Sequence, residues 1–157
     1  MKHKYLWALD ISLNCTGIVI FRNDMKPVFI GNINTSKCEN LQMKLSMFGM
    51  RINELLQKYE PYQVVGEKGF YRFMASSEAI WQVTGVAKYL LADYPQEFYA
   101  PTTIKKLVGG KGSMKKDELA KVVLDNYCNE SVKFETDDES DAYACGICYF
   151  KKIGVLK

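Results

Sequence analysis

Hydrophobic residues in the N-terminal part of the chain follow the pattern of extended strands. Residues 4 to 11 form an apolar run with Asp10 near its end, and residues 16 to 22 are rich in β-branched and aromatic side chains. A turn over residues 23 to 26 precedes a third strand, residues 27 to 33. Because the links between these strands are short, the pattern predicts an antiparallel meander.

The period of the pattern then changes to that of a helix. Apolar residues recur at three- and four-residue steps from Leu41 to Leu56, which predicts an amphipathic helix that ends at Pro61. The later elements are predicted as strands over 63–67 and 97–100, a helix over 75–92, a helical turn or two over 102–108, a helix capped by Ser113 and running to about Tyr127, and a last helix over 138–152.

The element order is therefore β-β-β-α-β-α-β-α-α, which predicts an α/β fold with a mixed five-stranded sheet and helices on both of its faces. A chain of 157 residues is long enough to bury a substantial core. Because no repeat, low-complexity tract or linker divides the sequence, residues 1–157 are expected to form a single domain.

Composition narrows the class of protein. Hydrophobic residues make up 48% and charged residues 25% of the chain, an ordinary globular balance. No apolar run reaches the ~20 residues that span a bilayer. The sequence meets Asp10 before the apolar region of a signal peptide is complete, so we expect a cytoplasmic protein.

The cysteines do not suggest a disulfide framework, because their number is odd and no secretion signal is present. Cys145 and Cys148 form a C-x-x-C pair. Without a second such pair or a nearby histidine, we interpret them as two small apolar residues on one helical face. The five cysteines are Cys15, Cys38, Cys128, Cys145 and Cys148.

Charge is distributed unevenly along the chain. Residues 135–141 hold five acids and no base. Because the whole chain has a net charge of +3, the rest of the chain has a net charge of +8. A basic body with one acidic focus fits a protein that binds a polyanion and holds cations at its reaction centre. A solvated acidic loop would give the same distribution, so the choice between them depends on the motifs.

Four carboxylates stand at positions that predict a common site. Asp10 and Glu67 each end an apolar strand, where a charge is costly unless it is solvated, paired or metal-bound. Asp138 and Asp141 are three residues apart at the start of a predicted helix and therefore share a face. Those two could instead be favourable charges at a helix N-terminus. It is the order and spacing of all four that favour a site.

Such a cluster is expected to hold divalent cations, since close carboxylates repel one another unless a cation neutralises them. Oxygen-only ligands select hard ions, so the expected cofactor is Mg²⁺, two ions per active site, with Mn²⁺ as a substitute. Two such ions can clamp the attacking water and the leaving oxygen of a phosphoryl displacement.

Three motifs in this order resemble the RuvC family of Holliday junction resolvases, within the RNase H-like superfamily. The first is Leu9–Gly17, with its strand-end aspartate and its Thr-Gly, and the second is Val64–Phe70, with its strand-end glutamate. The third is Asp138–Ala142, which is similar to the family's D-x-x-D-A. Lys105-Lys106 and Gly112–Lys116 resemble a basic segment and a loop of the family. The resemblance covers roughly residues 5 to 150.

The resemblance implies an RNase H-like fold with Asp10, Glu67, Asp138 and Asp141 as metal-binding catalytic residues. The chain departs from the family pattern after Asp10, where Ile11 stands in place of a frequent proline and Ser12 in place of a frequent glycine. Neither departure removes a ligand.

Five lysines within twelve residues are predicted to contact DNA, because lysines on a glycine-containing loop can follow a phosphate backbone. A solubilising loop is the alternative. The resemblance places Lys116, with either Lys105 or Lys106, near the scissile phosphate, where a cation stabilises transition-state charge. The five are Lys105, Lys106, Lys111, Lys115 and Lys116.

The segment after Glu67 combines bases with aromatic residues. Lys68 and Arg72 flank Phe70 and Tyr71, and such a loop can stack on bases unpaired at a branch point. The resemblance favours Phe70 as the stacking residue. The alternative is that two of the three aromatic residues in this segment, which also contains Phe73, pack into the core.

The helix predicted over residues 75–92 corresponds to the one that pairs two subunits in the family. The resemblance therefore implies a homodimer, whose two active sites suit paired cuts in a four-way junction. Sequence alone leaves open whether Trp81 lies at that interface or in the core.

Because the chain stops at Lys157, soon after the last helix, we expect a short, bacteriophage-encoded member. Its dependence on host branch-migration proteins is open.

The leading hypothesis is an Mg²⁺-dependent endonuclease that cuts Holliday junctions, and also three-way junctions or forks, leaving 5′-phosphate and 3′-hydroxyl ends. Four acids would equally suit an RNase H-like nuclease acting on structured RNA or RNA–DNA hybrids. An actin-like nucleotide-binding domain also begins with a strand-end aspartate, but this chain is short for two lobes. A non-catalytic junction-binding protein would need the lysines without the acids.

Overall fold

A five-stranded mixed sheet forms the centre of the molecule, in the strand order β3-β2-β1-β4-β5. The computed structural model describes residues 4–69 and 74–157. β1 pairs antiparallel with β2 and parallel with β4. β2 pairs antiparallel with β3, and β4 pairs parallel with β5. The strands are β1 (Tyr5–Asp10), β2 (Cys15–Phe21), β3 (Pro27–Asn34), β4 (Pro61–Glu67) and β5 (Gln96–Tyr99).

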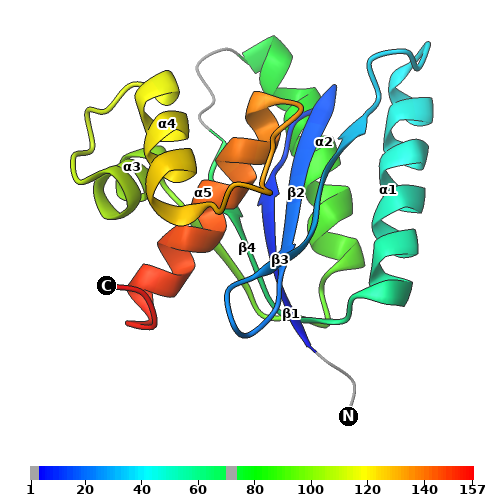
Figure 1. The fold of residues 1–157 in the computed structure, drawn as a ribbon. Coiled ribbons are helices and arrows are strands. Elements are labelled where there is room, and N and C mark those ends of the chain that lie inside the picture. The colour runs from blue at the N-terminus through cyan, green and yellow to red at the C-terminus, as the bar shows by residue number, and fades with distance from the viewer. Residues whose placement is uncertain (1–3, 70–73) are drawn as a thin grey trace.

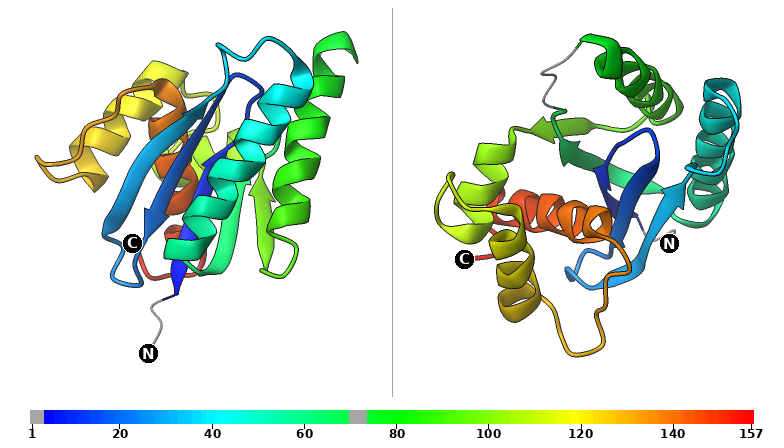
Figure 2. Two further views of the ribbon diagram at one scale, coloured as in Figure 1. Left: turned by 90° about the vertical axis from the view of Figure 1, so that its right-hand side faces the viewer. Right: turned by 90° about the horizontal axis from the view of Figure 1, so that it is seen from above.

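Helices cover both faces of the sheet, as the sequence predicted (Figures 1 and 2). α1 and α2 lie side by side on one face, and α5 lies across the other with α3 and α4 beside it. The helices are α1 (Leu41–Lys58), α2 (Met74–Leu90), α3 (Pro101–Gly109), α4 (Lys116–Tyr127) and α5 (Asp137–Lys152).

The two faces of the sheet bury two separate hydrophobic cores. Successive side chains of a strand point to opposite faces. Leu6 and Ala8 of β1 therefore pack with α3, α4 and α5, whereas Trp7 and Leu9 pack with α1 and α2. Because both faces are covered, β1 is apolar along its whole length up to Asp10, and this explains the unbroken hydrophobic run in the sequence.

The structure differs from the predicted order after β5, where residues 101–109 form a complete helix. Pro101 at its first turn presets the backbone angle, and Gly110 ends it in the left-handed region at φ 91°. The chain therefore ends in three helices rather than two. α4 begins at Lys116 rather than after Ser113, because the backbone N–H of Lys115 donates to the Glu118 carboxylate and makes Lys115 the N-cap.

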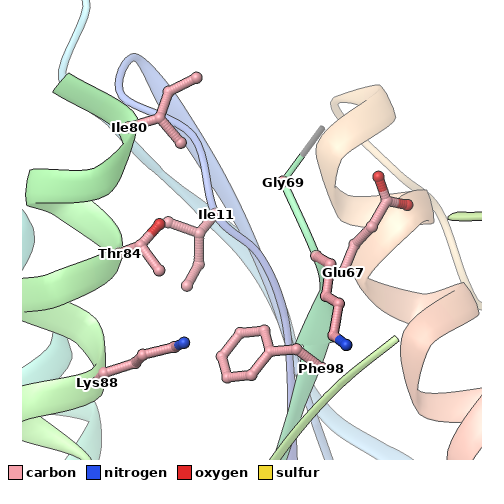
Figure 3. Close-up of a pocket in the computed structure, with 8 residues that line it drawn as sticks. Ile11, Glu67, Gly69, Ile80, Thr84, Lys88 and Phe98 are labelled. Carbon is pink, nitrogen blue, oxygen red and sulfur yellow. The ribbon is translucent and has the colours of Figure 1, made fainter. Parts of the chain in front are cut away.

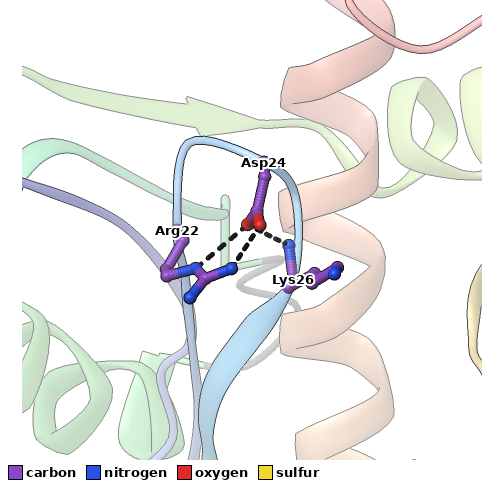
Figure 4. Close-up of polar contacts among 3 residues, drawn as sticks. All are labelled: Arg22, Asp24 and Lys26. Atoms are coloured by element: carbon purple, nitrogen blue, oxygen red, sulfur yellow. Dashed lines mark hydrogen bonds and ion pairs between the residues drawn. The ribbon is translucent and has the colours of Figure 1, made fainter.

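The β2–β3 turn lies at the end of the sheet away from the carboxyl ends of β1 and β4. The Asp24 carboxylate pairs with Arg22 and accepts from the backbone N–H of Lys26 at 3.2 Å (Figure 4). The Arg22 hydrogen bond lowers the pKa of Asp24 to about 2. Met25 takes a positive φ of 65° to close the turn.

The placement of Cys145 and Cys148 agrees with their interpretation as small apolar residues on one helical face. All five are free thiols, and Cys145 and Cys148 are buried on α5 within the core. Over residues 4–69 and 74–157, no helix is both long and apolar enough to cross a membrane.

Candidate active site

Asp10 and Glu67 meet at one edge of the sheet because their strands are parallel neighbours. Leu9 of β1 is in register with Gly66 of β4, so the next residue of each strand is the carboxylate that ends it. β5 runs in the same direction beside β4, and Tyr99 is in register with Glu67. The predicted convergence of these two strand ends is therefore present.

Gly17 brings the start of α5 to the same edge. It is in register with Asp10 on the neighbouring strand. A Cβ at Gly17 would lie 1.9 Å from the backbone carbonyl oxygen of Asp138 and 2.8 Å from the backbone nitrogen of Glu139. Only a residue without a side chain allows the first turn of α5 to approach β2 this closely.

A cleft of about 160 Å³ lies where these elements meet. Three of the four predicted carboxylates line it, and Asp138 lies beside it, near the thiol of Cys15. Pro101 and Leu119 also form its walls, although nothing in the sequence marked either of them as a site residue. The lining residues are Asp10, Glu67, Pro101, Lys105, Lys116, Leu119 and Asp141.

The electrostatics of the cleft are those of crowded, partly buried acids. Burial, followed by repulsion from Asp141, Glu67 and Asp138, raises the pKa of Asp10 to about 8. Burial is also the main cause that raises the pKa of Glu67 and of Asp141. A cation among these groups would relieve both the desolvation and the repulsion.

Lys116 supplies the positive charge closest to the acids. Its Nζ lies 2.5 Å from Oδ2 of Asp141, whose side chain is only 13% exposed. Partial burial opposes the charge on Lys116, but the hydrogen bond and the attraction of Asp141, with that of Asp10, raise its pKa above the ordinary value. The ammonium therefore stays charged at the mouth of the cleft.

The acids fit a hard divalent cation by donor type, since all four offer carboxylate oxygens, and burial among other acids raises the pKa of Asp10. They do not form a ready-made cage. Within residues 4–69 and 74–157, no three Asp, Glu, Cys or His side chains are already arranged around one metal position. Asp141 instead pairs with Lys116.

Glu139, between the two predicted ligands of α5, has a structural role. Its side chain is buried and accepts from the amide of Asn32 at 2.7 Å and from the backbone N–H of Glu135 at 2.7 Å. It therefore ties α5 to β3 and to the preceding loop. Composition alone could not separate it from its acidic neighbours.

The predicted DNA-binding lysines fall into two groups. Lys105 and Lys116 line the cleft, so Lys105 rather than Lys106 faces the acids. Lys106, Lys111 and Lys115 are exposed on α3 and on the connection to α4.

Lys68 is also exposed, on the segment that follows β4. The predicted base-stacking residues Phe70, Tyr71 and Arg72, together with Phe73, lie outside the described residues. On α2, Trp81 is 54% exposed, which excludes the core alternative for that residue.

Comparison with known sequences identifies one family. The family model described as crossover junction endodeoxyribonuclease RuvC matches residues 8–149. The crossover junction endodeoxyribonuclease RuvC of Orientia tsutsugamushi (strain Boryong) is 31% identical over 143 residues, which cover 87% of this chain and 89% of the relative. The RuvC of Thermomicrobium roseum is 26% identical over 138 residues, which cover 86% of this chain and 84% of the relative.

Comparison with solved structures identifies the same fold. Thermus thermophilus RuvC has a TM-score of 0.78 at 18% identity, with 98% of each chain covered. The same protein in complex with Holliday junction substrate has a TM-score of 0.78 at 19% identity, with 99% of each chain covered. The predicted RNase H-like fold is thereby confirmed.

Proposed function

The chain belongs to the RuvC family of crossover junction endodeoxyribonucleases, and from this premise we propose that it resolves Holliday junctions by metal-dependent phosphodiester hydrolysis in the Asp10 cleft. The observation that carries the proposal is the meeting of Asp10, Glu67 and Asp141 with Lys116 in one cleft, with Asp138 beside it. This arrangement is what phosphoryl transfer requires, because most of its catalysis is positioning and charge stabilisation.

Mg²⁺ is the cofactor in this proposal, with two ions held by Asp10, Glu67, Asp138 and Asp141 and with Mn²⁺ as a substitute. When bound, such ions activate a water and stabilise charge on the attacked phosphate and on the leaving oxygen. Hydrolysis adds one water across the P–O3′ bond and leaves a 5′-phosphate and a 3′-hydroxyl.

The side chains around the acids have distinct tasks. Lys116, which is catalytic in this proposal, pairs with Asp141 in the cleft and would stabilise charge on a non-bridging phosphate oxygen. Lys105 extends the positive lining of the cleft toward Glu67. The exposed Lys106, Lys111 and Lys115 follow the phosphate backbone of the bound arms.

Two features of the proposal concern assembly. A homodimer, built through α2 with its exposed Trp81 and Tyr89, would present two active sites to opposed strands of a junction. Phe70, with Tyr71, Arg72 and Lys68, is proposed to stack on bases opened at the branch point.

The proposed reaction takes place in the cytoplasm, where a recombination nuclease would meet its DNA, with residues 1–157 acting as one domain.

One experiment tests the function. Labelled four-way junction, three-way junction, fork and linear duplex are incubated with the protein, with and without Mg²⁺. We expect paired symmetric cuts in the junction only when Mg²⁺ is present. Asp10→Asn should still shift the junction in a binding gel but should not cut it. Equal cleavage of matched RNA or RNA–DNA hybrid substrates would instead favour the RNA nuclease, and full cleavage by Asp10→Asn would remove Asp10 from the mechanism.

A further inference from the structure

A second cavity, of about 270 Å³, adjoins the acidic cleft on the α2 side of the sheet. Glu67 lines both cavities and is the wall between them. In Figure 3, Ile80, Thr84 and Lys88 line the α2 side of the cavity, Lys88 points toward Phe98 of β5, and the Glu67 carboxylate points away from α2. A group bound in this cavity would therefore lie one side chain from the proposed reaction centre.

The walls of the cavity combine a flat aromatic surface with hydrogen-bond donors. The Phe98 ring rests against the β4 backbone, where a Cβ on Gly66 would come within 2.9 Å of it. The β4 backbone therefore supports the ring on one side. The Nζ of Lys88 lies over the ring, 4.8 Å from its centroid. Ile11 and Ile80 provide apolar sides, and the Thr84 hydroxyl faces the same space.

We propose that this cavity binds a nucleobase of the DNA strand at or next to the scissile phosphate, and that Thr84, Lys88 and Phe98 determine which base is preferred. The proposal rests on the proposed nuclease function, since it is the phosphate in the neighbouring cleft that would place a base here. The ligand class follows from the lining: an aromatic ring, lysine ammonium groups and apolar side chains are the groups with which proteins hold unpaired bases.

Size and polarity agree with a single base. A cavity of about 270 Å³ lies just below the usual range of small-ligand sites, roughly 300–1,000 Å³, and is therefore suited to one ring system rather than a whole nucleotide. The Lys88 ammonium can only donate hydrogen bonds, and the Thr84 hydroxyl can donate as well. The pocket should therefore favour bases that present carbonyl or ring-nitrogen acceptors at the edge facing α2.

A base reaches such a pocket only after leaving its stack, which costs least where pairing is already interrupted. A branch point supplies that interruption. The pocket therefore links cleavage-site preference to the branched substrate. When the exchange point carries a base rich in hydrogen-bond acceptors next to the scissile phosphate, binding of that base in the pocket positions the phosphate in the acidic cleft.

The test pairs base removal with pocket removal. Junctions are prepared with one abasic position at a time on either side of the cut, and cleavage is measured in Mg²⁺ for the wild type, Thr84→Val, Lys88→Met and the distant control Lys121→Met. We expect one position at which base removal slows the wild type and the control about tenfold, but slows Thr84→Val and Lys88→Met less than threefold.

Three outcomes overturn the inference: the full abasic penalty retained in both pocket variants, no penalty at any position in the wild type, or a penalty that falls equally in the Lys121→Met control. The first two leave junction cleavage itself, and so the proposed function, intact. If the wild type cut no junction, the proposed function would fail. The same abasic junctions would then be tested for binding affinity in EDTA. A tenfold loss of affinity for the wild type and the Lys121→Met control, with less than a threefold loss for the two pocket variants, would support the inference on its own.

Discussion

Gly17 and Asp138 are in such close contact that a single methyl group cannot fit between them. A Cβ at Gly17 would lie 1.9 Å from the Asp138 carbonyl oxygen, closer than any unbonded atoms allow. Gly17 is also the register partner of Asp10. The glycine therefore sets the separation of the two elements that carry Asp10 and the acids of α5, and this separation decides whether one cation can reach both.

Gly17→Ala should push the first turn of α5 away from β2 and separate the acids. We expect cleavage to fall by at least 100-fold and the free energy of unfolding to fall by about 1–3 kcal/mol, the usual cost of overpacking. Gly49→Ala is the matched control, because a Cβ there meets only Leu90 and Val86 at ordinary distances of 3.6 and 3.8 Å. That variant should be active and stabilised by roughly 0.5–1 kcal/mol. A fully active Gly17→Ala would contradict the close approach.

Lys116→Met should affect the chemical step more than binding. Loss of a cation that faces transition-state charge costs about 10²–10³ in rate, so single-turnover cleavage at saturating protein should fall by that factor. The adjacent Lys115 is exposed and does not line the cleft. Lys115→Met should weaken junction binding and its salt dependence while changing saturated cleavage by less than about threefold. Equal effects of the two substitutions would remove the special role of Lys116.

Metal-free protein should lose stability as pH rises, because Asp10 keeps its proton in the folded state to about pH 8 but releases it near pH 4 when unfolded. The folded form is favoured below pH 4, and this advantage disappears between pH 4 and pH 8. Asp10→Asn carries no such titration. In EDTA at pH 8 we expect it to be more stable than the wild type by up to about 5 kcal/mol, or roughly 10–20 °C in Tm.

The difference between wild type and Asp10→Asn should vanish toward pH 4, and Mg²⁺ should stabilise the wild type far more than the variant. Asp93→Asn, at an exposed position between α2 and β5, is the control and should follow the wild type throughout. Scanning calorimetry across pH measures all three proteins. A wild type whose Tm stays constant from pH 4 to pH 8 in EDTA would contradict the burial of Asp10.

Glu139→Gln should reduce stability without removing a ligand. The carboxylate accepts from both Asn32 and the backbone of Glu135, and a glutamine amide would turn one donor toward another donor. We expect a loss of about 1–3 kcal/mol in urea unfolding, with cleavage per folded molecule and its Mg²⁺ dependence within threefold of wild type. Glu130→Gln, at an exposed position, controls for the lost charge. A large change in Mg²⁺ dependence would instead make Glu139 a ligand.

The sequence predicted the sheet and most helices because hydrophobic periodicity records which face of each element is buried. β1 is apolar along its whole length because helices cover both sides of it, and that run made Asp10 stand out. The ends of α3 and the start of α4 were predicted less well. They depend on local features, the left-handed conformation of Gly110 and the backbone hydrogen bond of Lys115. Neither feature changes the hydrophobic periodicity of the sequence.

The site was predicted in part for a similar reason. Strand order places Asp10 beside Glu67, and helical spacing places Asp138 with Asp141, so parallel pairing and periodicity suffice for both pairs. The hydrophobic pattern could not distinguish Lys105 from Lys106. The packing of α3 against α5 decides which of the two lysines faces the cleft. The pattern also could not show Glu139 as structural, since its partner Asn32 is 107 residues away.

The central claim is that Asp10, Glu67, Asp138 and Asp141 hold divalent cations in one cleft. The most direct measurement is anomalous diffraction from crystals of the protein soaked in Mn²⁺. The account predicts anomalous peaks between Asp10 and the other three carboxylates, with Asp141 released from Lys116, and predicts their loss in Asp10→Asn. Peaks only elsewhere on the surface, or none at millimolar Mn²⁺, would contradict it.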